Sequence, residues 1–150
     1  QKDFGPMVTK VSDTNNKELL PQELYDLFMK EYVNRTEPLK LLHYSEAIRG
    51  TDQSSIEAEM LYSGRNVTIH GEGNGIISAF CKAIEGLLGI DVEVVNYSEH
   101  SLEYGSKSRA ITYIQMRCDG KDYYGAGISS NITKSSLRAI VTAINKILKA

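Results

Sequence analysis

The 150-residue sequence predicts an α+β fold in which a unit of three β-strands and one α-helix occurs twice, with the two copies related by a pseudo-twofold axis. Three observations predict this fold. The spacing of the apolar residues changes from helical to alternating near Leu39. A turn, a strand and a glycine then occur twice at one separation, and each copy ends in an amphipathic helix. A short helical subdomain precedes the first copy.

Residues 1–36 are predicted to form this helical linker subdomain. Pro21 suits the first turn of a helix, and Glu23 lies where the helix dipole favours negative charge. An apolar stripe follows at spacings of three and four residues, formed by Leu24, Leu27, Phe28 and Tyr32. We therefore expect a helix over about 21–34. Pro38 separates it from a domain over 37–150, whose two units span about 37–89 and 90–150.

Alternating apolar residues predict the strands of both units. In the first unit they indicate strands over 39–45, 55–62 and 66–70, with a hairpin turn over 63–66. The glycine-rich segment GEGNGIISAF, residues 71–80, then leads into a helix. In the second unit they indicate strands near 90–103, 109–118 and 121–128, a turn at Asp119 and Gly120, and a last helix over about 133–149.

The two units can be aligned by counting. Gly64 and Gly120 are separated by the same 56 residues as Gly71 and Gly127. The apolar faces of the two helices match at an offset of 60 residues. The face of the first helix is formed by Ile77, Phe80, Cys81, Ile84 and Leu88, and that of the second by Leu137, Ile140, Val141, Ile144 and Leu148. We therefore expect four extra residues between the last strand and the helix of the second unit.

This architecture leaves sheet surface to be buried. One helix covers one face of a three-stranded sheet, so the remaining faces must pack against the other unit or another chain. Apolar residues on both sides of a strand, as at Ile111, Tyr113, Ile114 and Met116, are typical of a sheet that is covered on both faces. The sequence therefore predicts an interface.

The composition is that of an ordinary globular domain, with 41% hydrophobic and 24% charged residues. A net charge of −2 argues against a dedicated nucleic-acid binder. No apolar run is long enough for a membrane span, and no signal peptide opens the chain. Cys81 and Cys118 are interpreted as buried thiols, so we expect a cytoplasmic protein. Because the chain starts at Gln1 without a Met, we expect a fragment of a longer protein.

The glycine-rich segment has two open interpretations. It matches neither G-x-G-x-x-G nor the phosphate loop G-x-x-x-x-G-K-[ST], so a nucleotide site is not indicated. Free amides at the start of the following helix favour an anion, and Asn74 can cap the helix or bind a ligand. Alternatively, the glycines only make a tight turn from strand to helix.

No convincing catalytic set is present. His43, His70 and His100 are isolated and lack metal-ligand spacing. Glu99 and His100 are the one candidate acid–base pair, with a structural role as the alternative. A basic last helix, with Lys134, Arg138, Lys146 and Lys149, resembles the end of a double-stranded-RNA-binding domain. A solvated charged face is the better interpretation, because the rest of the chain supplies no matching basic patch.

Three segments in order carry a specific resemblance: GEGNGIISAF, then GIDVEVVNYSEHSLEYGSKSRAITYIQM, then DGKDYYGAGISSNITKSSLRAIVTAINKIL. Together they resemble the C-terminal regulatory domain of 2-isopropylmalate synthase over residues 37–150. Residues 3–33 resemble the subdomain that links the regulatory domain of that enzyme to its catalytic barrel.

The resemblance implies a division of labour. The family condenses acetyl-CoA with 2-oxoisovalerate in a TIM barrel that holds a divalent metal, and that barrel is not in this chain. This part would be non-catalytic and without a cofactor of its own. It would form a homodimer and bind leucine, the end product, for feedback inhibition. An RNA-binding α/β module and a free-standing enzyme using Glu99 and His100 remain as alternatives from other classes.

The resemblance also places the leucine pocket on particular residues: Gly73, Asn74, Gly75 and Ser78 in the first loop and helix, Val94, Tyr97 and Ser101 after it, Ser108 and Ala110, and Ile128 and Ser129. Amides at the helix start would receive the carboxylate, and the small residues Ser78, Ser101 and Ala110 would leave room for the side chain. Ile76 and Asn96 depart from the family pattern, as do Ser78 and Ser101. Citramalate synthase uses the same type of domain to sense isoleucine, which is the alternative effector.

Overall fold

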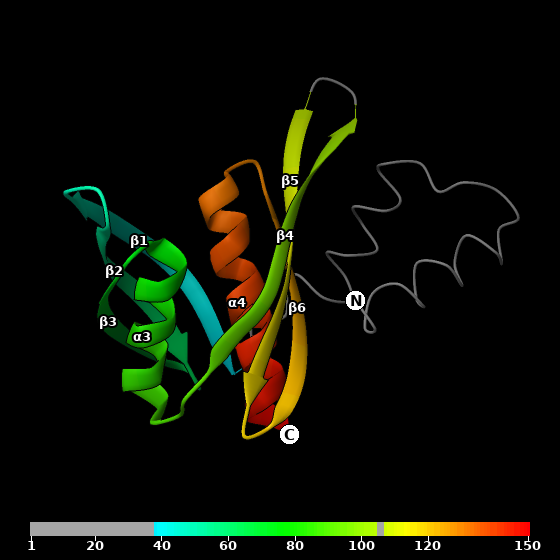
Figure 1. The fold of residues 1–150 in the computed structure, drawn as a ribbon. Coiled ribbons are helices and arrows are strands. Elements are labelled where there is room, and N and C mark those ends of the chain that lie inside the picture. The colour runs from blue at the N-terminus through cyan, green and yellow to red at the C-terminus, as the bar shows by residue number, and fades with distance from the viewer. Residues whose placement is uncertain (1–37, 105–106) are drawn as a thin grey trace, which may run out of the picture.

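The computed structural model describes residues 38–104 and 107–150, and they form the predicted unit twice (Figure 1). The first unit consists of β1 (Leu39–Arg49), β2 (Gln53–Tyr62), β3 (Arg65–Gly73) and α3 (Ile76–Leu88). The second consists of β4 (Glu93–Tyr104), β5 (Lys107–Cys118), β6 (Lys121–Ser129) and α4 (Ile132–Lys149). The α+β class and the two βββα repeats are thus confirmed. The predicted helix over 21–34 lies outside the described residues.

Each unit is an antiparallel sheet with one helix packed on it. The strand orders are β1-β2-β3 and β4-β5-β6, so every hairpin joins neighbours. α3 packs on β3 and β2, and α4 packs on β6 and β5. Figure 1 shows α4 between the two sheets. Both units share one core, to which each sheet and each helix contributes, including Ile56, Met60, Phe80, Ile84, Ile114, Met116, Leu137, Ile140 and Ile144.

The first strand of the chain is held by the last helix. The Leu39 N–H donates to Asn145 Oδ1 at 2.8 Å, and Asn145 Nδ2 donates to the Leu39 carbonyl oxygen at 2.9 Å. Both residues are buried, so these paired bonds satisfy a buried amide side chain and the end of a strand together. The two units are therefore joined by polar bonds as well as by the core.

The expected insertion of four residues in the second unit is wrong. The residues that precede the helices, Gly75 and Asn131, are separated by the same 56 residues as the strands. Packing gives the same alignment, because a Cβ on Gly71 would overlap the Ala79 carbonyl oxygen and a Cβ on Gly127 would overlap that of Ser135. An apolar stripe repeats with each helical turn, so a shift of four residues leaves the pattern nearly unchanged. α4 is simply longer at its C-terminal end.

The register reveals a further repeat that the sequence analysis missed. β1 has an irregular pairing at Leu42, and β4 has one at Val95. Each is followed by the same tripeptide, Tyr44-Ser45-Glu46 in β1 and Tyr97-Ser98-Glu99 in β4. The two tyrosines therefore occupy equivalent places, on the helix-facing side of their sheets.

The two sheets differ in their second face. In β5, Ile111 is as fully buried as Ile114 and Met116, so the expectation of a sheet covered on both faces holds there. In β2, the buried Ile56, Ala58 and Met60 alternate with the exposed Glu57 and Glu59. The outer face of the first sheet is therefore polar and open in the protomer, and its burial against another chain stays a prediction.

Candidate functional site

A groove of about 480 Å³ lies where the start of α3 meets the start of β4. Five of the predicted site residues line it, namely Asn74, Gly75, Ser78, Val94 and Tyr97. The strand residues come from the second unit and the others from the first, so the groove lies at the junction of the two units.

The first turn of α3 offers free hydrogen-bond donors to this groove. Gly75 precedes the helix and has no side chain that could cap it, and its carbonyl oxygen accepts only the first helical bond, from the Ala79 N–H at 2.9 Å. The N–H groups of Ile76, Ile77 and Ser78 precede the first intrahelical donor and have no cap. No acidic side chain occupies the turn. The positive end of the helix dipole is therefore available to an anion.

Gly73 supports the groove from beneath. It is buried at the end of β3, and a Cβ there would overlap Ser78 Oγ and the backbone nitrogen of Ala79. The first turn of α3 can approach the strand this closely only because residue 73 has no side chain. Gly73 thus positions the helix start and does not itself line the groove.

Sequence reasoning missed part of the groove wall. The groove is also lined by Ile76, Ile77, Cys81, Lys82, Glu85 and Val92. Ser78, Cys81, Lys82 and Glu85 follow the spacing of one helix face, which was a usable signal once Ser78 had been placed in the site. The contribution of Val92 was not readable from spacing, because it depends on how β4 passes α3.

A hydrogen bond and a buried thiol characterise the wall of the groove that lies away from the helix start. Glu85 Oε2 accepts the Val92 N–H at 2.9 Å, which ties α3 to the residues leading into β4. Burial, with a smaller contribution from the nearby Glu85 carboxylate, raises the pKa of the Cys81 thiol to about 12. The Cys81 thiol is therefore protonated at neutral pH. It lines the groove as a weakly polar group and is not an activated nucleophile.

A comparison with known families assigns this architecture. Residues 18–148 match the family model described as the LeuA allosteric (dimerisation) domain. The chain belongs to this family. The resemblance to the regulatory domain of 2-isopropylmalate synthase is thereby confirmed.

Individual relatives of this LeuA domain carry one name. The 2-isopropylmalate synthase of Acetoanaerobium sticklandii is 42% identical over the whole chain, and that of Desulfitobacterium hafniense is 38% identical over 97% of it. The enzyme of Corynebacterium glutamicum strain R is 35% identical over 99% of it. The alignments cover 27%, 26% and 24% of those proteins, so the chain spans about a quarter of the length of the curated relatives it matches.

The other predicted site residues of the LeuA domain do not line this groove. Ser101, Ala110 and Ser129 form one row across β4, β5 and β6. Ser129 Oγ accepts the Asn131 N–H at 3.1 Å, so it serves the start of α4. Ser108 pairs with Glu103 further along the hairpin, and Ile128 is fully buried. Their part in a ligand site stays a prediction.

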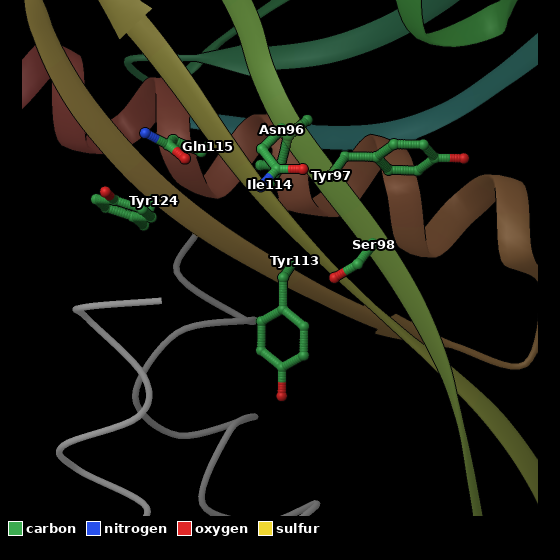
Figure 2. A pocket seen from close by; sticks show the side chains of 7 residues that line it. All are labelled: Asn96, Tyr97, Ser98, Tyr113, Ile114, Gln115 and Tyr124. Carbon is green, nitrogen blue, oxygen red and sulfur yellow. The ribbon is translucent and has the colours of Figure 1, made fainter.

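Two other hollows fit an amino acid less well. The hollow in Figure 2 lies on β4, β5 and β6 and is lined by Asn96, Tyr97, Ser98, Tyr113, Ile114, Gln115 and Tyr124. Its volume of about 40 Å³ admits water only. A depression of about 580 Å³ on the outer face of the first sheet is lined by exposed polar side chains, such as the ion pair of His70 and Glu57 at 3.5 Å.

The rival sites of the sequence analysis are not assembled. Glu99 lies on the face of β4 that carries α4, whereas the His100 ring packs edge-on against Tyr113, with the ring centroids 5.8 Å apart. Neighbouring strand residues face opposite sides, so this pair cannot act on one atom. Among the described residues, no three His, Cys, Asp or Glu are grouped to hold a metal.

The basic last helix is also partly committed to the fold. Arg138 Nη1 donates to the Ile128 carbonyl oxygen at 2.7 Å, which holds this guanidinium on β6. Within the described part of the chain, no helix is long and apolar enough to span a membrane.

Proposed function

We propose that this LeuA domain binds leucine in the groove at the start of α3 and is the feedback-regulatory, dimer-forming part of a 2-isopropylmalate synthase. The observation that carries the proposal is the uncapped first turn of α3 facing a groove with apolar walls. The names of the relatives support the parent enzyme, and the family description supports regulation and dimerisation.

The groove matches the three parts of an amino acid. The N–H groups of Ile76, Ile77 and Ser78 suit a carboxylate. Ile77, Val92 and Val94 suit a branched aliphatic side chain, whose burial contributes roughly 1.5–3 kcal/mol. The Asn74 amide oxygen, beside the helix start, is an acceptor for the ammonium group on the same carbon as that carboxylate.

Feedback would follow from differential binding. Leucine can lower activity only by binding more tightly to a less active arrangement of the enzyme, and the difference in binding free energy sets the size of the shift. In the proposed parent, a separate barrel with its divalent metal would condense acetyl-CoA with 2-oxoisovalerate in the cytoplasm. The row of Ser101, Ala110 and Ser129 would complete the site from a partner subunit in the homodimer.

Calorimetric titration of the 150-residue chain tests the proposal. We expect leucine to bind and isoleucine to bind more weakly. The variant Gly75→Asp places a carboxylate where the ligand carboxylate would lie, and it should abolish binding through like-charge repulsion. Gly86→Asp is the matched control, because residue 86 lies exposed on the same helix outside the groove.

Light scattering should show the same dimer for the wild type and both variants. Unchanged leucine affinity in Gly75→Asp would refute the groove as the site. Tighter binding of isoleucine would move the parent enzyme to citramalate synthase, and no binding of either amino acid would refute the function.

A further inference from the structure

Glu99 connects the groove to the second helix. The Tyr97 ring lines the groove, and its hydroxyl donates to Glu99 Oε1 at 3.3 Å. The other carboxylate oxygen, Oε2, accepts from Ser136 Oγ at 3.5 Å. Both distances are long for O–H···O hydrogen bonds, so each contact is weak in the ligand-free protein.

Ser136 is a fixed anchor for this carboxylate. It is 3% exposed at the start of the second turn of α4, and its hydroxyl lies 3.4 Å from Thr112 Oγ1. Ser136 Oγ also donates to the Ile132 carbonyl oxygen at 3.1 Å, which accepts from Ser135 Oγ at 2.8 Å as well. The single Ser136 proton is therefore shared between the Ile132 carbonyl oxygen and Glu99.

The first unit repeats the tyrosine and the glutamate but not the anchor. Tyr44 and Glu46 correspond to Tyr97 and Glu99, and Phe80 takes the place of Ser136. The strand partner of Glu46 is Ile56, whereas that of Glu99 is Thr112. In the described residues, Tyr44 donates no hydrogen bond to Glu46. The fold therefore forms without this polar cluster, so its presence in the second unit calls for another role.

We propose that Glu99 is a positioning residue, which holds the Tyr97 ring as a wall of the groove and couples occupancy of the groove to the first turn of α4. This inference rests on the proposed leucine function. Tyr97 is 45% exposed, so packing alone leaves its ring free to turn. A ring that is already held loses less freedom when a ligand packs against it.

The test is a double-mutant cycle on leucine affinity, measured by calorimetry. Glu99→Ala should weaken binding about tenfold, which is the order expected for loss of a charge-assisted hydrogen bond. In a Tyr97→Phe background the same change should have less than a twofold effect, because the hydroxyl that Glu99 holds is gone. Glu99→Gln, which keeps one acceptor, should recover part of the affinity. Glu46→Ala is the matched control and should leave affinity unchanged.

Hydrogen exchange supplies the second readout. Leucine should slow exchange at the amides of the first turn of α4 in the wild type but not in Glu99→Ala. Additive effects of Glu99→Ala and Tyr97→Phe, or equal slowing in both proteins, would overturn the positioning role while leaving leucine binding intact.

The ligand-free protein separates this inference from the function. The Tyr97 pKa is raised by burial, then by the charge of Glu99 and its hydrogen bond. Glu99→Ala should lower the Tyr97 pKa in a ring titration followed by NMR, whereas Glu46→Ala should not. If the wild type failed to bind leucine, the function would be refuted, and an unchanged Tyr97 pKa would independently refute the positioning role.

Discussion

α3 and α4 begin at equivalent positions of the two repeats, but their first turns are completed differently. At α4, Asn131 Oδ1 accepts the Lys134 N–H at 2.9 Å, and the Asn131 N–H donates to Ser129 Oγ. At α3, Gly75 supplies no cap, and the free amides face a groove. Since both helices form, the open start is not required by the fold. The difference teaches that the two repeats share their packing but not their helix caps. Only the first repeat has backbone N–H groups at its helix start that a ligand can bind.

The first way to sharpen the comparison is to test whether the two units pack alike. Gly71→Ala and Gly127→Ala each drive a methyl group into the backbone of the helix, and each should lower the free energy of unfolding by about 3 kcal/mol. Gly75→Ala, whose Cβ would meet open space, is the control. Urea unfolding at one protein concentration measures all three. A large effect in only one unit would show that the packing is not equivalent.

Exchanging the caps tests the central difference. Gly75→Asn gives α3 the residue that caps α4, and the space for its side chain is open. The new side chain should satisfy the amides that a ligand would use, so leucine affinity should fall at least tenfold, or about 1.4 kcal/mol. Calorimetry measures the affinity, and thermal unfolding should show a slightly more stable protein.

The reverse change is the control for the cap exchange. Asn131→Gly should cost only a few tenths of a kcal/mol in stability and should not alter binding. Retained affinity in Gly75→Asn would break the link between an open helix start and the ligand.

The buried Cys81 thiol in the groove predicts a pH effect on stability, and Leu137 stands at the equivalent position of α4. Well below pH 9 the thiol is neutral in both the folded and the unfolded state. Above it, the unfolded chain loses the proton while the folded protein, with a pKa of about 12, retains it. The free energy of unfolding should therefore fall by about 1.4 kcal/mol at pH 10 from this group alone.

Urea unfolding at pH 8 and pH 10 tests whether the free energy of unfolding falls as predicted. The loss between the two pH values should be smaller in Cys81→Ala by that amount. Equal losses in the two proteins would mean that the buried thiol is not responsible.

The smallest expected effect concerns one basic residue at an equivalent position of each helix. Arg138 on α4 donates to a carbonyl oxygen of β6, whereas its counterpart Lys82 on α3 is exposed. Arg138→Ala should cost about 1 kcal/mol, and Lys82→Ala should stay within about 0.5 kcal/mol of the wild type. Thermal unfolding of both variants measures these costs. Equal losses of stability would show that the hydrogen bond to Ile128 does not stabilise the fold.

The elements were predictable because their signals are local. Alternation in β2 and the glycine spacing around residues 64–75 follow from which residues suit a pleated strand or a turn. The offset of the helices was predicted wrongly, since a helical stripe maps onto itself after one turn. The Tyr-Ser-Glu repeat was present in the sequence but gained meaning only from the register of β1 and β4.

The candidate site was predictable only in part. Asn74 and Gly75 lie in the glycine-rich segment that indicated an anion at the helix start, and Ser78 was placed by resemblance. All three line the groove, and their part in a ligand site stays a prediction. Cys81 and Glu85 share the helix face of Ser78, so periodicity contained them. The row of Ser101, Ala110 and Ser129 came from resemblance, and within one protomer it lies on the second sheet, away from the groove.

The sequence by itself determined the repeated unit with its strands and helices, because each depends on residues close together in the chain. It left open whether Asn74 caps α3, which the structure decided. Tertiary structure decided which elements meet. Asn145 holds Leu39 across 106 residues, and Val92, Val94 and Tyr97 of the second unit complete a wall beside the helix of the first. Such contacts depend on how two amphipathic units bury their apolar faces in one core, and no local pattern encodes that choice.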